Sequence, residues 1–506
     1  MNWFDSWALT LVTFIPIVGM VVMLIIPRKE EYSIKVVALL TTVVTFGVSV
    51  AIAARFDYDA GGGLQFDVDK PWIDTISSRY HVGIDGISLP LLLLTTFITV
   101  ACVIYSWNHF PKPHTPKAFL ALILVLETGM VGTFIAQDLI LFFVFFEIVL
   151  LPMFFMIGVW GGPNRSYASI KFFLFTMFGS AFMLLGFLAI FWQTGTFDIP
   201  ELSAMAGDGI VGSTQNLIFA GLFLGFAIKV PMFPFHTWLP DAHTEAPTVG
   251  SVLLAAVLLK LGTYGFVRIA LPVLPDAAID WAPWLGLLAV IGIIYGALAC
   301  LAQSDMKRLI AFSSVAHMGF VMLGIATLTD IGINAAVFGM VAHGLITGML
   351  FFLAGSVGER YGTREMSRLG GLLTQTPRLG WILGFLAMAS LGLPGLAGFW
   401  GEFPAILAAY NPLDALPLET FRSYMVIAAV GTVLAAGYLL WMLQRVAMGK
   451  VKPEFEQTDV HDINTAEWIA WSPILLFVLA LGVYPDIIFG VTNDAVAQLT
   501  ATAFGG

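Results

Sequence analysis

Long apolar stretches alternate with short polar segments along the whole chain. A transmembrane helix needs about 20 predominantly apolar residues, and we find fourteen stretches that meet this requirement. They begin near Trp3, Ser33, Gly86, Lys117, Asp138, Tyr167, Gln215, Ala246, Ile279, Met306, Gly332, Arg378, Arg422 and Ala466. The longest polar connection runs from Arg55 to Asp85, so no separate soluble domain is expected. The pattern predicts an all-α polytopic membrane protein with about 14 transmembrane helices.

Two of these spans contain residues that break helices. The seventh carries Lys229 and then Pro231, and the twelfth carries a Gly-Leu-Pro-Gly segment at 392–395 and then Glu402 and Pro404. Proline removes a backbone hydrogen bond and clashes with the preceding turn, so a carbonyl near each charge is freed. In transporters built from inverted repeats, discontinuous helices at corresponding positions indicate an ion path.

The seventh and twelfth spans are separated by an odd number of spans, which reverses the direction of the chain in the membrane. We therefore expect two inverted five-helix repeats. The predicted organisation is residues 1–110 for helices 1–3 and an outer loop, 115–272 for helices 4–8, 279–447 for helices 9–13, and 466–490 for helix 14.

Lys and Arg are unevenly divided between the two sides of the predicted bundle. If Arg28, Lys29 and Lys35 are cytoplasmic, fifteen of the 23 basic residues fall on that side, five on the other and three within spans. The first span follows Met1 with no basic segment before it and no clear cleavage site, so we expect it to remain as a helix. Both termini are then predicted on the outer, periplasmic side of a bacterial plasma membrane.

Composition agrees with this class and excludes others. The chain is 58% hydrophobic and 11% charged, and its net charge of −10 does not indicate a nucleic-acid partner. Cys102 and Cys300 lie in different spans, so neither a thiolate-bound iron–sulfur cluster nor a disulfide is suggested. Because there is also no nucleotide-binding glycine motif, we expect no cofactor and no metal in this chain.

Several ionisable residues lie inside the predicted spans, where they mark proton, ion or substrate paths by default. At 1.5 Å rise per residue, five of them fall near the middle of the membrane. They are Glu147, Lys229, Lys260, His317 and His343. They form a predicted polar row in the plane of the bilayer, with Glu402 on the twelfth span as the counterpart of Lys229. The alternative is that each is an isolated buried polar group with local partners.

Proton transfer requires groups that can change protonation state. A carboxylate beside a buried lysine keeps the lysine charged, and separating the two favours release of the proton. Glu147 and Lys229 could form such a pair, and Lys260, His317 and His343 could pass protons laterally through water, since histidine titrates near neutral pH. Moving a proton against the membrane potential needs energy, so another subunit or an ion gradient must supply it.

Other polar residues are possible accessories, each with an ordinary alternative. Glu127 could support Glu147 or satisfy a local hydroxyl, and Lys171 could extend to the cytoplasmic surface. Asp241 and His243 lie where the chain turns between the seventh and eighth spans, where they could guide protons inward or cap a helix. The spacing of His236 from His243 matches no common zinc pattern. We expect Arg360, Arg364 and Arg368 to share one face of a short helix as a positive-inside surface or as a partner or lipid contact.

Five segments closely resemble the M-type antiporter-like membrane subunits of proton-translocating NADH–quinone oxidoreductase, respiratory complex I. The most specific is HTWLPDAHTEAPT at 236–248, continuing to LLKLGTYG at 258–265; the others are FFEIVLLP at 145–152, WGG at 160–162, SDMKRLIAFSS at 304–314 and GLPGLAGFWGE at 392–402. The resemblance runs from about His81 to Arg445. The long C-terminal extension of the L-type subunits is absent from this sequence.

The resemblance implies fourteen helices, inverted five-helix repeats and a proton channel. It implies that Glu147 and Lys229 are the coupled pair, Lys260 is the central carrier, and Glu402 is the exit-side residue, with the two histidines between them. It also implies that NADH, flavin mononucleotide (FMN), iron–sulfur clusters and quinone belong to other subunits, and that L-type and N-type membrane-arm subunits are neighbours. The alternative function is a subunit of a multisubunit sodium–proton antiporter; a purely structural scaffold is a third hypothesis.

Overall fold

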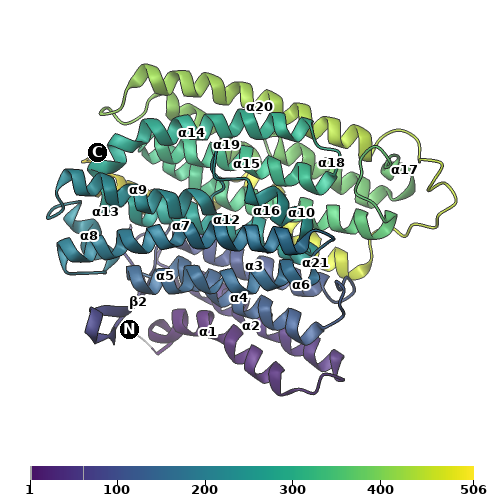
Figure 1. Cartoon of the computed structure of the whole chain (residues 1–506), viewed down its shortest axis with the longest axis horizontal. Helices are drawn as coiled ribbons and strands as arrows, with labels where there is room; N and C mark the ends of the chain where they lie inside the picture. The colour runs from purple at the N-terminus through teal and green to yellow at the C-terminus, as the bar shows by residue number, and fades with distance from the viewer. Residues whose placement is uncertain (1–2, 61, 506) are drawn as a thin grey trace.

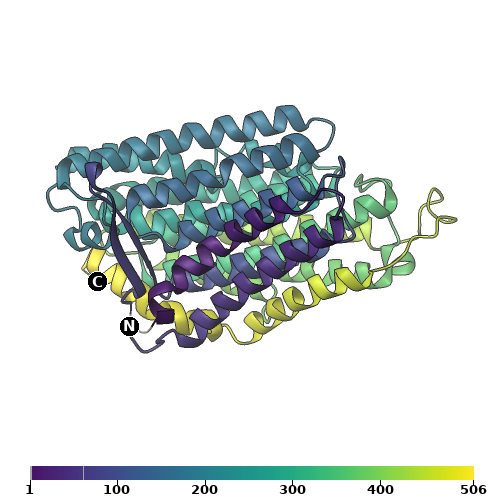
Figure 2. The ribbon, with the colours of Figure 1, turned by 90° about the horizontal axis from the view of Figure 1, so that it is seen from below.

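The computed structural model describes residues 3–60 and 62–505. Long helices run side by side along one axis and form a single bundle (Figures 1 and 2). The start of α1, the end of α22, a β-hairpin and the short helices α8 and α13 lie at one end of this bundle, which we call the hairpin end. Helix α17 and the adjoining loops lie at the opposite end (Figure 1).

Eight α-helices precede residue 212 in the described part of the chain. They are α1 (Trp3–Ile25), α2 (Glu31–Arg55), α3 (Ser88–Tyr105), α4 (Pro116–Ile135), α5 (Leu139–Ile148), α6 (Leu150–Trp160), α7 (Arg165–Thr194) and α8 (Ile199–Met205). Helices α5 and α6 together make one span, Leu139–Trp160. A small irregularity at Val149 separates them, directly after the turn that carries Glu147.

The remaining helices follow from residue 212 onward. They are α9 (Gly212–Lys229), α10 (Trp238–Glu245), α11 (Thr248–Leu253), α12 (Leu259–Gly265), α13 (Leu271–Val273), α14 (Pro275–Leu301), α15 (Met306–Ala326), α16 (Asp330–Tyr361), α17 (Leu372–Gln375), α18 (Pro377–Ser390), α19 (Ala397–Tyr410), α20 (Leu418–Val446), α21 (Thr465–Val483) and α22 (Asp486–Phe504). Two π-helical turns, η2 (Leu254–Leu258) and η3 (Phe266–Ala270), join α11, α12 and α13 into one span, Thr248–Val273.

Twelve helical segments of the described residues are long and apolar enough to cross a membrane. The seventh and twelfth predicted spans are not among them, because each is interrupted: one between α9 and α10, the other between α18 and α19. The predicted fold class, a polytopic helical membrane protein with these two broken helices, is confirmed. The domain boundaries stay a prediction.

The twelfth span breaks at a different place from the one that the proline pattern suggests. The interruption lies at the glycine segment, where Gly392 and Gly395 adopt φ values of +80° and +92° that favour glycine. Pro404, by contrast, lies inside α19, which continues through it to Tyr410. Glu402 therefore lies in the second half-helix, whereas Lys229 is the last residue of the first half-helix of its span.

An antiparallel β-hairpin occupies the outer loop, where we predicted no regular structure. Strands β1 (Gln65–Ile73) and β2 (Ser78–Ile84) pair with Val68 opposite Val82 and Lys70 opposite Tyr80, and a 3₁₀ turn, η1 (Asp74–Ile76), joins them. The strands mix apolar and polar residues and contain no apolar stretch long enough for a span, so hydropathy gave no signal for them. Sequence reasoning thus missed the β element at this end.

The most buried spans are the eighth (Thr248–Val273), α15 and α16. Small residues allow their neighbours to approach closely. At Gly401 of α19, an added Cβ would lie 2.6 Å from the Cα of Gly339 on α16. This close contact brings α19, and with it Glu402, against the centre of the bundle.

Candidate functional site

Lys260 lies at the centre of the eighth span, between the two π-helical turns. A π-turn leaves backbone carbonyls without their usual helical partner and is frequent at functional sites. Lys260 is fully buried, and its Nζ donates to the carbonyl of Ala255 at 2.5 Å. The irregular helix therefore provides an oxygen for an ammonium group that the hydrophobic surroundings could not otherwise accommodate.

The same lysine contacts a histidine from another helix. Lys260 Nζ lies 2.8 Å from Nδ1 of His343 on α16. The other ring nitrogen of His343, Nε2, is buried and has no hydrogen-bond partner among the described residues. A proton that reaches His343 from Lys260 can therefore leave only on the far side of the ring.

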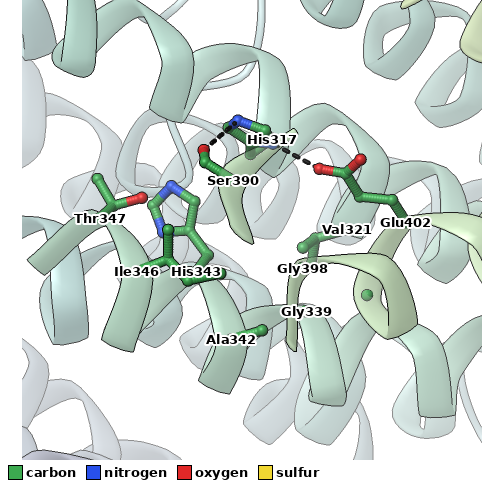
Figure 3. A pocket seen from close by; sticks show the side chains of 11 residues that line it. His317, Val321, Gly339, Ala342, His343, Ile346, Thr347, Ser390, Gly398 and Glu402 are labelled. Atoms are coloured by element: carbon green, nitrogen blue, oxygen red, sulfur yellow. Dashed lines mark hydrogen bonds and ion pairs between the residues drawn. The ribbon is translucent and has the colours of Figure 1, made fainter. Parts of the chain in front are cut away.

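That far side borders a small internal cavity of about 30 Å³. Figure 3 shows the rings of His343 and His317 facing this space, with Ser390 and Glu402 at its edge. The ring centroids of the two histidines are 6.1 Å apart, too far for a direct hydrogen bond. A cavity of this size between polar groups can hold a bridging water molecule.

His317 on α15 connects the cavity to the broken twelfth span. Its Nδ1 lies 2.6 Å from Oε1 of Glu402 (Figure 3). Its Nε2 lies 3.2 Å from the hydroxyl of Ser390 and 3.1 Å from that of Tyr438. Both ring nitrogens are thus engaged, and their partners determine the orientation of the ring.

Glu402 lies between two spaces. Its Oε2 is buried and has no partner among the described residues. The residue lines the histidine cavity on one side and, on the other, a hollow between α19 and α20 whose other lining residues include Phe399, Phe403 and Val433. That second hollow is predominantly apolar.

Glu147 and Lys229 are near each other but not bonded. Within the described residues they form no ion pair with an N–O distance of 4.0 Å or less. Lys229 is buried, and its Nζ lies 4.6 Å from the centroid of the Phe146 ring. Glu147 interacts with Lys229 electrostatically and lies beside the hydroxyl of Ser180 on α7.

Glu127, a predicted accessory, is fully buried on α4, and neither carboxyl oxygen has a hydrogen-bond partner among the described residues. A local hydroxyl does not satisfy it, contrary to one of our two alternatives. An isolated carboxyl group in such a place is expected to be neutral, because an unpaired buried charge is very costly.

The other predicted accessories lie toward the end of the bundle that is opposite the hairpin end. Lys171 pairs with Asp241 at 2.7 Å instead of extending freely to the surface. His243 is fully buried and stacks on Phe351, with a centroid distance of 4.4 Å. The ring of His236 is also buried, and neither histidine has a hydrogen-bond partner in the described part of the chain.

Two further polar contacts at this end were missed. Lys307, one of the fifteen basic residues assigned to the cytoplasmic side, is buried at 2% exposure, and its Nζ donates to the carbonyl of Ala246 at 2.5 Å. Arg360 forms a bidentate ion pair with the fully buried Glu467.

The predicted common arginine face is wrong. Arg360 belongs to the last turn of α16, while Arg364 and Arg368 follow in the loop before α17. A helical pattern across residues 360–368 had assumed that α16 continues, but Gly362 ends it in the left-handed conformation.

His81 on β2 anchors the hairpin outside the membrane spans. Its Nδ1 contacts Asp198, and its Nε2 lies 2.8 Å from Asp67. Burial opposes protonation of the ring, but the two carboxylates outweigh it and raise the pKa of His81 to about 9. The hairpin is therefore held by a charged histidine at neutral pH.

No group of three or more His, Cys, Asp or Glu residues that could hold a metal ion occurs between residues 3 and 60 or 62 and 505. What the site does contain is a line of exchangeable protons: Lys260, His343, a cavity, His317 and Glu402. Such a line within a helical bundle with two broken spans is typical of the antiporter-like class of membrane ion-translocating proteins.

Comparison with known proteins gives the same class and narrows it. Residues 136–418 match the family model "NADH:quinone oxidoreductase/Mrp antiporter, TM", and residues 69–133 match "NADH-ubiquinone oxidoreductase chain 4, amino terminus". The chain belongs to the NADH:quinone oxidoreductase/Mrp antiporter transmembrane family. The predicted resemblance to the M-type subunits is confirmed.

Individual relatives are similar in sequence to this chain over nearly their full length. The chain is 41% identical to NADH-quinone oxidoreductase subunit M of Rhodobacter capsulatus, covering 97% of this chain and 96% of the relative. It is 38% identical to NADH-ubiquinone oxidoreductase chain 4 of Arabidopsis thaliana, covering 96% and 95%.

Solved structures give the same fold. A chain of respiratory complex I from Thermus thermophilus with bound NADH matches with a TM-score of 0.86 at 28% identity, covering 98% of this chain and 99% of that chain. A chain of the Mrp complex from a Dietzia species matches with a TM-score of 0.85 at 21% identity, covering 99% and 98%, which shows the shared fold.

Proposed function

We propose that this chain is a proton-translocating membrane-arm subunit of NADH–quinone oxidoreductase. It has no redox role of its own: NADH, FMN, iron–sulfur clusters and quinone are handled by other subunits, which supply the energy. The observation that carries the proposal is the contact of Lys260 with His343, joined through one cavity to His317 and Glu402. The full-length relatives named as subunits of this oxidoreductase support it.

In the proposed mechanism, Lys260 is the central carrier. Its ammonium group donates a proton to Nδ1 of His343, and the proton on Nε2 of that ring passes to water in the cavity. The water delivers a proton to His317, which shares it with Glu402 through their hydrogen bond. Each step conserves the number of protons, because every group that receives a proton passes one on before it receives the next.

Glu147 and Lys229 control the other end of the row. Their attraction stabilises the charged lysine when the two approach, and their separation in this structure leaves Lys229 against the Phe146 ring. A change in that separation, imposed by a neighbouring subunit, alters the electrostatic potential at Lys260. Redox energy is thereby converted into proton movement without a cofactor in this chain.

Uptake from the opposite end uses the accessory groups. Asp241, with its partner Lys171, stands near that end, and the buried His243 interacts electrostatically with both Lys307 and Lys260. We assign these residues, together with His236, to the path by which protons reach Lys260. Glu127, buried and isolated, is assigned a supporting role for Glu147.

The assembly has further proposed features. The chain is embedded in a bacterial plasma membrane with the hairpin end, and so both termini, on the periplasmic side, as the distribution of Lys and Arg predicts. L-type and N-type membrane-arm subunits are its proposed neighbours. The alternative, a multisubunit sodium–proton antiporter, is supported by the fold shared with the Mrp complex; sodium-dependent exchange in the absence of NADH would favour it.

The test is proton pumping by the assembled complex in liposomes. We expect Lys260→Met to reduce pumping by about 100-fold or more, because loss of a proton-transferring group costs ~10²–10⁴-fold. Lys117→Met is the matched control: that lysine also donates to backbone carbonyls, those of Leu24 and Ile26, but lies away from the row. Equal pumping by the two variants would contradict the proposal.

A further inference from the structure

A second, larger cavity lies at the hairpin end and has no place in the row described above. It has a volume of about 370 Å³ and is bordered by Gly62–Leu64 before the hairpin, by Ser203 on α8, and by Gln498 on α22. The charged groups in its lining are Asp85 and Arg268. Arg268 belongs to η3, the π-helical turn at the hairpin end of the same span that carries Lys260.

Asp85 and Arg268 form an ion pair at the floor of this cavity. Nη2 of Arg268 lies 2.5 Å from Oδ2 of Asp85, and the side chains are only 12% and 3% exposed. Oδ1 of Asp85 accepts hydrogen bonds from the backbone of Ile87 and from Ser88. Burying two charges is costly even when they are paired, so their place in the lining of a cavity that also presents Ser203 and Gln498 points to a role in transport.

Tyr264 joins this ion pair to the interior. Nε of Arg268 donates to the Tyr264 hydroxyl at 3.2 Å, and that hydroxyl donates to the carbonyl of Phe134 at 2.8 Å. Tyr264 is fully buried and follows Lys260 by four residues on α12, about one helical turn. A hydroxyl can both accept and donate a proton.

The hollow beside Glu402 differs from the cavity at Asp85 in its position in the bundle. The hollow on the far side of Glu402 is lined mostly by apolar side chains and faces the gap between α19 and α20. The cavity at Asp85 lies instead among loops and short helices at the end of the bundle, where the chain is expected to meet solvent. Of the two, only the Asp85 cavity lies at the end of the bundle, and its lining residue Arg268 belongs to the span that carries Lys260.

We propose that this cavity is the outer end of a proton-release path that runs from Lys260 through Tyr264 to the Asp85–Arg268 pair. The inference rests on the proposed function, and it gives Lys260 a second route for its proton beside the transfer to His343. Lys260 turns from Ala255 toward Tyr264, and its proton passes, directly or through water, to the tyrosine hydroxyl oxygen while the hydroxyl proton moves on to water in the cavity. Tyrosine ends with the proton number it began with, and ionised Asp85 stabilises the proton in transit.

Removal of single groups gives the first test. In the complete complex in liposomes, we expect Tyr264→Phe to lower protons released per NADH oxidised by about 100-fold, the lower end of the usual cost of losing a proton-transfer group. Tyr424→Phe is the matched control, because its hydroxyl also donates to a carbonyl, that of Pro283, at 3.0 Å. Normal pumping by Tyr264→Phe alongside inactive Lys260→Met would overturn this inference while leaving the proposed function intact; active Lys260→Met would refute the proposed function itself.

Obstruction of the cavity gives a test that does not alter the ion pair. Ser203→Cys places a thiol in the lining, and Ser213→Cys places one on the exposed start of α9 at the same end. Both native cysteines are buried, so a membrane-impermeant thiosulfonate reagent should modify only the new thiol. We expect modification to reduce pumping about tenfold in Ser203→Cys and to leave Ser213→Cys unchanged. Full modification of Ser203→Cys with normal pumping would contradict the path.

Discussion

The two broken helices hold their ionisable residues in opposite ways. Lys229 ends the first half of its span and touches an aromatic ring, with Glu147 nearby but not bonded. Glu402 lies inside the second half of its span and contacts His317 directly at 2.6 Å. The first region can change the strength of an electrostatic interaction by movement, whereas the second can transfer a proton through an existing hydrogen bond.

The same sequence pattern can therefore produce two different local structures. Both regions place a charge two residues before a proline, yet only the first breaks at that proline. In the second, the break lies at the glycine segment, and the helix then presents Glu402 to the histidine cavity. In the proposed mechanism, the control of charge and the conduction of protons are therefore separated between the two regions.

Among changes to these two regions, removal of the Lys229 charge should have the largest effect on proton pumping. We expect Lys229→Met to reduce proton pumping by about 100-fold, because the charge that Glu147 acts upon is lost. Glu147→Gln should reduce it to a similar extent, although the two side chains form no hydrogen bond. Pumping would be measured with a pH-sensitive dye in liposomes; a large effect in only one of the two variants would refute their coupling.

Glu402→Gln should have a smaller effect, about tenfold on pumping. The amide can still hydrogen-bond to His317, but it cannot accept a proton, so transfer slows while the geometry is kept. Glu402→Asp, which retains a carboxyl group one methylene shorter, should recover part of the rate. If the amide variant pumped normally, proton transfer at this contact would be excluded.

Ser390→Ala and Tyr438→Phe test the orientation of the His317 ring. Each removes one hydroxyl beside Nε2, and we expect pumping to fall about fivefold, in line with ~1 kcal/mol for a net hydrogen bond. The double variant should lose more than the product of the two single effects, because each hydroxyl substitutes in part for the other. A loss equal to the product of the two single effects would indicate that the two contacts act independently.

His81 provides a histidine–carboxylate contact outside the spans against which the His317–Glu402 contact can be judged. Its folded-state pKa of about 9 exceeds the usual 6.5, so the hairpin should lose stability as pH rises from about 6.5 to 9. With screening at the half-exposed Asp67, the loss should be on the order of 1–2 kcal/mol.

Hydrogen exchange at β1 and β2 amides, corrected for intrinsic pH effects, would measure the loss. His81→Gln should abolish the pH dependence without changing pumping. A pH dependence that persisted in His81→Gln would assign it to another titratable group.

Local sequence was sufficient to predict the spans, the two interruptions and the central row of titratable residues. Hydropathy identifies a span because each stretch must match the bilayer thickness on its own. Lys260, His317, His343 and Glu402 could be selected because charges in apolar stretches are rare. The fold class and the family of the chain are confirmed, while the roles of these four residues remain predictions.

Partners between distant segments could not be predicted in this way. Nothing near Arg360 in sequence indicates that it pairs with Glu467, and Lys307 looks like an ordinary surface lysine until α15 packs beside Ala246. The β-hairpin was missed because its strands of 9 and 7 residues contain no long apolar stretch, and the π-turns beside Lys260 because their sequence is apolar and uniform.

The sequence by itself determined which residues must enter the membrane and at what depth, since both follow from hydropathy and from the fixed rise of a helix. Only the tertiary structure decided which of them touch: Lys260 meets His343, Glu402 meets His317, and Glu147 stays apart from Lys229. The physical reason is that contact depends on helix rotation, on small residues such as Gly339 and Gly401 that let helices approach, and on where the helices break.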